Sequence, residues 1–133
     1  MFKLMTHKNK LKNDFSKCFD PLKSALMNVP LPMQKDRYIT ASILGTCRAY
    51  AELHQINEKD FAVLVDAVFE EIYRQNSMAV QNLTEHWLQE NDTEFMQAYY
   101  HAKGNLLAGR DLKWLAKYAQ QHFKPAVEVH HST

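Results

Sequence analysis

The chain has 133 residues, of which 46% are hydrophobic and 23% charged, and its formal net charge is +1. These values are typical of one globular domain and exclude an intrinsically disordered chain. The sequence holds only 3 glycines and 4 prolines, which favours helices because these two residues destabilise a helix most. It has no apolar run of the kind found in signal peptides or membrane spans, so we expect a cytoplasmic protein that does not bind membranes.

The charges are distributed unevenly. Residues 1–37 are basic, with 8 Lys or Arg and 3 Asp or Glu. Residues 52–94 are acidic, with 2 basic and 10 acidic residues. Residues 95–124 are basic again, with 5 basic residues and 1 acidic residue. This layout lets neighbouring helices attract one another, or it presents a surface of both signs to a partner. The basic first segment is poor in arginine, so we do not expect nucleic acid binding.

Apolar residues recur every three or four positions along most of the chain, which predicts amphipathic helices. The first apolar stripe comprises Leu11, Phe15, Cys18, Phe19, Leu22 and Leu26. Pro21 interrupts this stripe, so we expect a break near residue 20 with Asp20 as the cap of the next turn. Residues 28–32 predict a loop, because two prolines cannot both lie inside a helix.

A long helix is expected over about residues 33–55, followed by a second that starts at the capping residue Asn57. The apolar face of the first comprises Ile39, Ile43, Cys47, Tyr50 and Ala51, and His54 extends it. The face of the second comprises Phe61, Leu64, Val65, Val68, Phe69 and Ile72. On its polar side, Glu70 and Arg74 have the spacing of an ion pair one turn apart.

The pattern breaks or bends near residues 76–77, and Asn91-Asp92-Thr93 predicts another helix start. Gly109 ends that helix or Gly104 bends it, and Asp111 caps a last helix that stops before Pro125. We therefore predict an all-α, single-domain bundle of five to seven helices with short loops. This domain covers residues 1–125, and residues 126–133 form a frayed tail.

The sequence contains no nucleotide-binding glycine motif, HExxH or CxxC, so we assign no catalytic residues, cofactor or metal ligands. None of the seven histidines form a pair four residues apart on a helix. Three helices could still bring one histidine each to a common point. A metal- or haem-binding bundle is therefore one alternative function.

Residues 98–118 (AYYHAKGNLLAGRDLKWLAKY) resemble the phosphotransfer helix of histidine-phosphotransfer domains, which are helical bundles of about this size. In that family an exposed histidine precedes Lys-Gly, and the resemblance implies phosphotransfer at His101 with Gly104 admitting the partner. The family places its Lys and Gly three and four residues after the histidine. In this chain, Lys103 and Gly104 lie two and three residues after His101. At about 100° per residue, Lys103 points roughly 200° away from His101.

Aromatic residues also lie outside the predicted core faces. Met96 and Tyr100 share a face of one helix, and Trp114 and Tyr118 share a face of the next. Either these helices bury two faces, or the residues form an exposed patch that has the composition of a protein-binding surface. Lys103 and Lys117 would then lie at the rim of the patch.

We therefore expect a small, non-catalytic helical protein that acts by binding another protein, as an adaptor, chaperone, immunity protein or regulator. A second copy of the chain would be one such partner, giving a homodimer.

Overall fold

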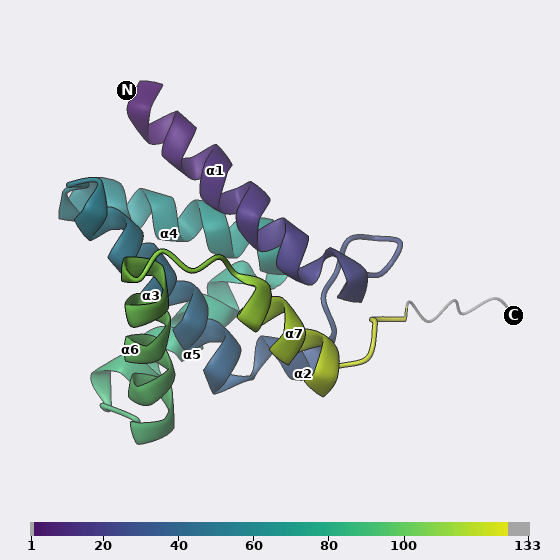
Figure 1. The fold of residues 1–133 in the computed structure, drawn as a ribbon. Helices are drawn as coiled ribbons and strands as arrows, with labels where there is room; N and C mark the ends of the chain where they lie inside the picture. Colours follow the sequence, from purple (N-terminus) through teal and green to yellow (C-terminus); the bar gives the residue numbers. More distant parts are fainter. Residues whose placement is uncertain (1, 128–133) are drawn as a thin grey trace, which may run out of the picture.

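The structure is a computed structural model that describes residues 2–127, and helices make up nearly all of its regular structure (Figure 1). In chain order the α-helices are α1 (Phe2–Phe19), α2 (Leu31–Gln34), α3 (Arg37–Leu53), α4 (Glu58–Tyr73), α5 (Ser77–Gln89), α6 (Thr93–Leu107) and α7 (Lys113–His122). Two 3-10 turns, Asp20–Leu22 and Arg74–Asn76, follow α1 and α4. No strand occurs within residues 2–127, so the predicted all-α fold is confirmed.

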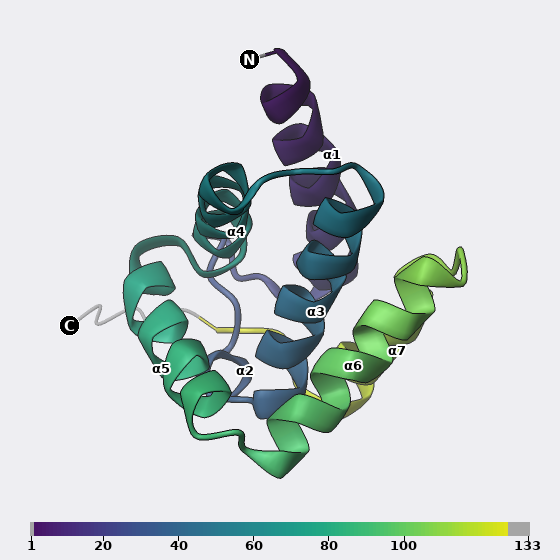
Figure 2. The same ribbon diagram turned by 90° about the vertical axis from the view of Figure 1, so that its left-hand side faces the viewer.

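Helices α3 and α6 lie side by side at the centre of the bundle and run in the same direction (Figure 2). They can be parallel because α4 and α5 carry the chain from the end of α3 back to the level at which α3 begins. Helix α1 packs against α4 and α7. A large apolar cluster fills the space among α1, α3, α4 and α7, and a smaller one lies between α3, α5 and α6.

The predicted apolar faces are buried along most of their length. The buried residues include Leu11, Phe15, Cys18, Phe19 and Leu22 before the first loop, Ile39, Ile43, Cys47, Tyr50 and Ala51 on α3, and Phe61, Leu64, Val68, Phe69 and Ile72 on α4. The assignment of Leu26 to the first stripe is wrong, because this side chain is 68% exposed. The helical turn ends at Leu22, so the spacing that would have kept Leu26 on the same face no longer applies.

Side-chain caps determine where three helices begin. The carboxylate of Asp36 accepts a hydrogen bond from Ile39 N at 2.9 Å, so α3 starts at residue 37 rather than near residue 33. Asn57 Oδ1 accepts from Asp60 N at 2.8 Å and confirms the predicted start of α4. Asp92 caps α6 in the same way, with 2.9 Å to Phe95 N. Each cap gives an otherwise unpaired amide of the first turn a partner.

Two predicted local interactions are wrong. The 3-10 turn at residues 20–22 has Phe19 at its N-cap position and no side-chain cap, so Asp20 does not serve as one. Arg74 pairs with Glu71 at 3.5 Å instead of Glu70. The reason is the left-handed backbone of Arg74, whose φ of 54° ends α4 and removes the helical geometry that an i,i+4 pair needs.

The ends of α6 and of the described chain follow from backbone bonds. Gly109 has a φ of 79°, a conformation that glycine adopts without a steric penalty, and α6 ends just before it at Leu107. After α7, the amide of Ala126 donates to the carbonyl of Leu22 at 2.9 Å, which fastens the chain back to the first loop. Residues 128–133 of the predicted tail lie outside the described residues. Across residues 2–127, none of the helices has the length and apolar character that crossing a membrane requires.

Candidate functional site

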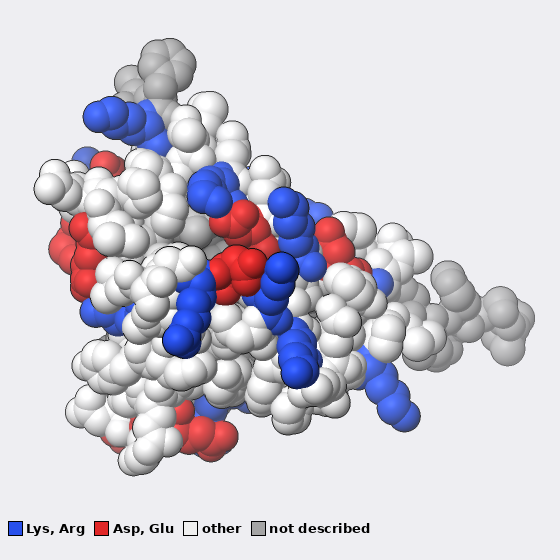
Figure 3. Space-filling view, in the orientation of Figure 1, with Lys and Arg blue, Asp and Glu red and all other residues white. Residues whose placement is uncertain are grey.

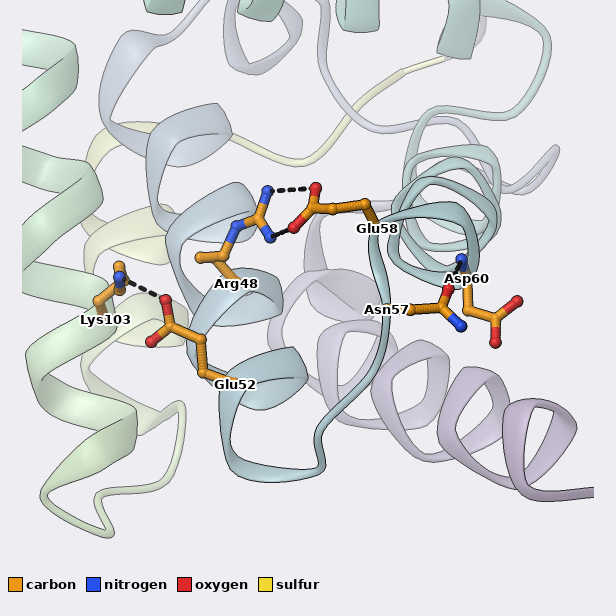
Figure 4. A network of polar contacts seen from close by, with 6 residues as sticks. All are labelled: Arg48, Glu52, Asn57, Glu58, Asp60 and Lys103. Atoms are coloured by element: carbon orange, nitrogen blue, oxygen red, sulfur yellow. Dashed lines mark hydrogen bonds and ion pairs between the residues drawn. The ribbon is translucent and has the colours of Figure 1, made fainter.

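The predicted patch is divided between two sides of α6. The ring of His101 lies edge-on to Trp114 of α7, with 5.3 Å between ring centroids. Lys103 reaches the other way, and its Nζ lies 2.9 Å from Glu52 Oε1 on α3 (Figure 4). Residues two apart on a helix point about 200° apart, so these two contacts mark opposite flanks of α6. The predicted residues therefore belong to two separate surfaces.

One surface is a continuous row of rings from α3, α6 and α7. We call Tyr38, His101, Trp114, Tyr118 and His122 the aromatic row. Tyr118 is stacked between Tyr38 and His122, with centroid distances of 4.0 Å to each. Trp114 lies edge-on to Tyr38 at 6.3 Å and links this stack to His101. The sequence-based prediction did not include two members of the row, Tyr38 and His122. Tyr38 joins the row only because α7 packs on α3. His122 lies four residues after Tyr118 on α7, so the helical spacing already places it beside Tyr118.

The centre of the aromatic row is half-buried and its ends are exposed. Tyr38, Trp114 and Tyr118 pack against the large apolar cluster, whereas His101 and His122 are exposed. Trp114 and Tyr118 therefore belong neither wholly to the core nor wholly to the surface. Both side chains are half-buried, and the indole nitrogen of Trp114 is fully buried.

A hydrogen bond fixes the position of Tyr118. Its hydroxyl donates to the carboxylate of Asp36, at 3.3 Å from Oδ2. Burial, together with the negative charge of Asp36 and the hydrogen bond to it, raises the pKa of Tyr118 to about 12. The phenol therefore stays neutral at physiological pH and keeps donating to the residue that caps α3.

The second surface is the outer flank of α6. Tyr100 is 62% exposed and Leu107, seven residues on and so on the same side, is 51% exposed. Met96 is half-buried against the small apolar cluster around Phe95. Lys103 is held by Glu52 and does not border the aromatic row, whereas Lys117 of α7 is exposed.

Lys103 belongs to a set of ion pairs that joins three helices (Figure 4). Beside the Lys103–Glu52 pair, Arg48 Nη1 lies 2.7 Å from Glu58 Oε1. The guanidinium of Arg48 also lies 3.7 Å from the centroid of the Phe61 ring. These contacts connect α6 to α3 and α3 to α4, which gives Lys103 a role within the fold.

His101 is exposed, as the resemblance to histidine-phosphotransfer domains requires. Its ring lies 3.5 Å from Nδ2 of the buried Asn105, whose Oδ1 accepts from Arg110 at 2.7 Å. A β-carbon placed on Gly104 would meet nothing within 4 Å, so the surface there is open. Lys103 lies on the far flank of the helix, away from the His101 ring. Phosphotransfer at His101 stays a prediction.

Metal binding also stays a prediction. Within the described part of the chain, no three His, Cys, Asp or Glu side chains are placed to hold a metal ion. His130 and His131 lie outside it. Cys18 and Cys47 are buried free thiols, and burial raises the pKa of each to about 12. Both thiols are therefore neutral in the folded protein.

No protein family, no curated protein and no solved structure matches this chain.

Proposed function

We propose that this protein is a non-catalytic helical module that binds another protein through the aromatic row. The observation that supports this most is the row itself: five rings from three helices that contact one another in sequence and whose two ends, His101 and His122, are exposed. Aromatic side chains bury a large area per residue at a low cost in conformational entropy. Trp and Tyr are accordingly enriched among the residues that contribute most to protein-protein affinity.

Pre-organisation of the row adds to this argument. Tyr118 is held by Asp36 and stacked between Tyr38 and His122. Trp114 is held between Tyr38 and His101. Rings that are already fixed lose little rotamer freedom when a partner covers them, so more of the contact energy contributes to affinity.

The half-buried state of the row decides how the proposal should be tested. Truncating Trp114 and Tyr118 to alanine would remove core packing as well as surface, and the loss of binding could not be separated from unfolding. A photo-crosslinking residue at an exposed end of the row avoids this difficulty. His101 and His122 are the suitable positions, and Lys59 on α4 and Met78 on α5 are exposed controls on other helices.

The experiment places p-benzoylphenylalanine at each of these four positions in turn and irradiates cells that make the protein at its natural level. We expect an adduct of the same mass from both row positions and no such adduct from the two controls. An adduct of twice the mass of the 15.5 kDa chain would identify the partner as a second copy. Identical adduct patterns at all four positions, or none at the row, would contradict the proposal.

A further inference from the structure

A second concave surface lies on the other side of α7 from the aromatic row. It is a groove between α1, the end of α3 and residues 106–116, with a volume of about 670 Å³. We call it the α1–α7 groove. Leu112 and Ala116 line this groove, whereas Trp114 and Tyr118 lie in the aromatic row. The two surfaces use different faces of α7, so each can be tested without the other.

The floor of the groove is apolar. Its apolar lining includes Leu11, Cys18, Tyr50, Leu106, Leu112 and Ala116. The Cys18 thiol is neutral and donates to backbone carbonyls, at 3.5 Å from Asp14 O and 3.6 Å from Leu112 O. Thr46 also lines the groove, and its buried hydroxyl has no hydrogen-bond partner among the described residues. A buried polar atom without a partner calls for an explanation, and a bound molecule is one.

The rim of the groove carries a surplus of positive charge. Four cations line it (Lys10, Lys17, Arg110 and Lys113) against two carboxylates, Asp14 and Asp111. Figure 3 shows this cluster in the middle of the view, with basic side chains around acidic ones where α1 approaches the segment before α7.

The carboxylates leave part of this charge unpaired. Lys10 pairs with Asp14 at 2.8 Å and Lys113 with Asp111 at 3.7 Å. Within residues 2–127, Lys17 and Arg110 have no carboxylate partner, and Arg110 bonds only the neutral side chain of Asn105. The rim therefore has two positive charges for an incoming anion.

We infer that the α1–α7 groove binds a free organic acid with an aliphatic chain. The apolar floor accommodates the chain, and the unpaired cations of the rim attract the carboxylate. The volume falls within the roughly 300–1,000 Å³ usual for small-molecule sites, which are mostly apolar with a few charged groups that orient the ligand. A hydrogen bond to a charged group contributes enough to separate a charged ligand from its neutral analogue by about ten-fold or more.

The test is a calorimetric titration of the full purified chain with decanoate, at concentrations where decanoate forms no micelles. Decanol has the chain without the charge, and acetate has the charge without the chain. We expect decanoate to bind about ten-fold more tightly than decanol, which lacks the charge. Its advantage over acetate should be larger, because acetate lacks the chain that the apolar floor accommodates. Absence of decanoate binding, or equal affinity for decanol, would overturn the assignment.

Charge variants locate the site. Lys17→Gln combined with Arg110→Gln removes the two unpaired, exposed rim cations and should weaken decanoate binding about ten-fold while leaving decanol binding unchanged. The matched control, Lys35→Gln with Lys59→Gln, removes two exposed cations elsewhere and should change neither affinity. Equal effects of the two pairs would place the ligand outside the groove and contradict the proposal.

A protein segment is the alternative occupant, and the same titration distinguishes it. If a Glu-rich amphipathic peptide binds the groove and decanoate does not, the site takes a partner protein and the small-ligand assignment is wrong. Because the titration uses the purified chain alone, its failure leaves the crosslinking result at the aromatic row unaffected.

Discussion

The backbone carbonyl of Tyr99 on α6 occupies the space that a β-carbon on Gly45 of α3 would need. The β-carbon of Ala102 lies just beyond, 3.2 Å from the same point. Gly45 is therefore the residue that allows α3 and α6 to approach so closely. Ala41 of α3 and Ala98 of α6 are also buried, and their small side chains let the two helices stay close along the rest of the contact. The aromatic row depends on this approach, because it places His101 of α6 beside α7.

Replacing this glycine should destabilise the protein. Gly45→Ala adds a methyl group against backbone, which cannot move aside as a side chain can, and we expect a loss of about 2 kcal/mol or more despite alanine's better helix propensity. Gly104→Ala is the matched control on α6, since its β-carbon would meet nothing within 4 Å. It should stabilise by up to about 1 kcal/mol. Urea unfolding measures the change in the free energy of unfolding for both variants. Equal changes would mean that the contact between α3 and α6 can accommodate a methyl group at Gly45.

Two buried threonines of α3 should respond in opposite directions to valine. Thr46 has no hydroxyl partner among the described residues, whereas Thr40 Oγ1 donates to Asp36 O at 3.2 Å. Thr46→Val therefore removes a buried unpaired hydroxyl and should stabilise by about 1 kcal/mol. Thr40→Val removes a hydrogen bond and should destabilise by about as much. If Thr46→Val instead destabilises the free protein, the hydroxyl has a partner, such as a bound water.

The contact between α1 and the end of α3 should weaken in mild acid. His7 lies against Tyr50 and His54, with ring centroids 5.2 and 4.8 Å away. Burial lowers the pKa of His7 below its ordinary value of 6.5, and the positive charges of His54 and Lys3 lower it further. The unfolded chain therefore binds this proton more readily than the folded one. The stability tied to His7 is present above pH 6.5 and is lost as the pH falls through 6.5 toward the folded value.

Urea unfolding at pH 8 and pH 5.5 tests this relation. Tyr50 and Lys10 also face this contact. Burial raises the pKa of Tyr50 and the hydrogen bond to Asp14 raises that of Lys10, so Tyr50 stays neutral and Lys10 stays charged across the interval. The wild-type chain should lose more stability between the two pH values than the His7→Gln variant, which cannot take up the proton. An equal loss in both chains would show that protonation of His7 does not weaken the fold.

Local features of the fold were predictable because they depend on neighbours in sequence. Asn57 and Asp92 start helices as their spacing indicates, since a cap bonds an amide only three residues away. Leu26 and Arg74 show where such reasoning ends. Both residues continue a helical pattern in the sequence. However, the helical turn ends at Leu22, before Leu26, and the backbone of Arg74 has a positive φ that ends α4. The 3.6-residue period predicts which side chains are neighbours only as long as the helix continues.

The candidate site was less predictable than the fold. Spacing alone placed Lys103 and His101 on opposite flanks of α6, and their contacts with Glu52 and Trp114 agree with this. Spacing did not show which flank faces α7. Tyr100 and Tyr118, which were grouped by composition, therefore belong to different surfaces.

By itself, the sequence determined that this chain is a helical bundle, which stripes of apolar residues enter the core, and where caps start α4 and α6. Those properties arise from residues within a few positions of one another, so the periodicity of the helix is sufficient to derive them. Only the tertiary structure decided that Tyr38 stacks on Tyr118, and that Lys17 and Arg110 border one groove. These pairs are separated by 80 and 93 positions, and such contacts depend on how whole helices pack, which no local spacing specifies.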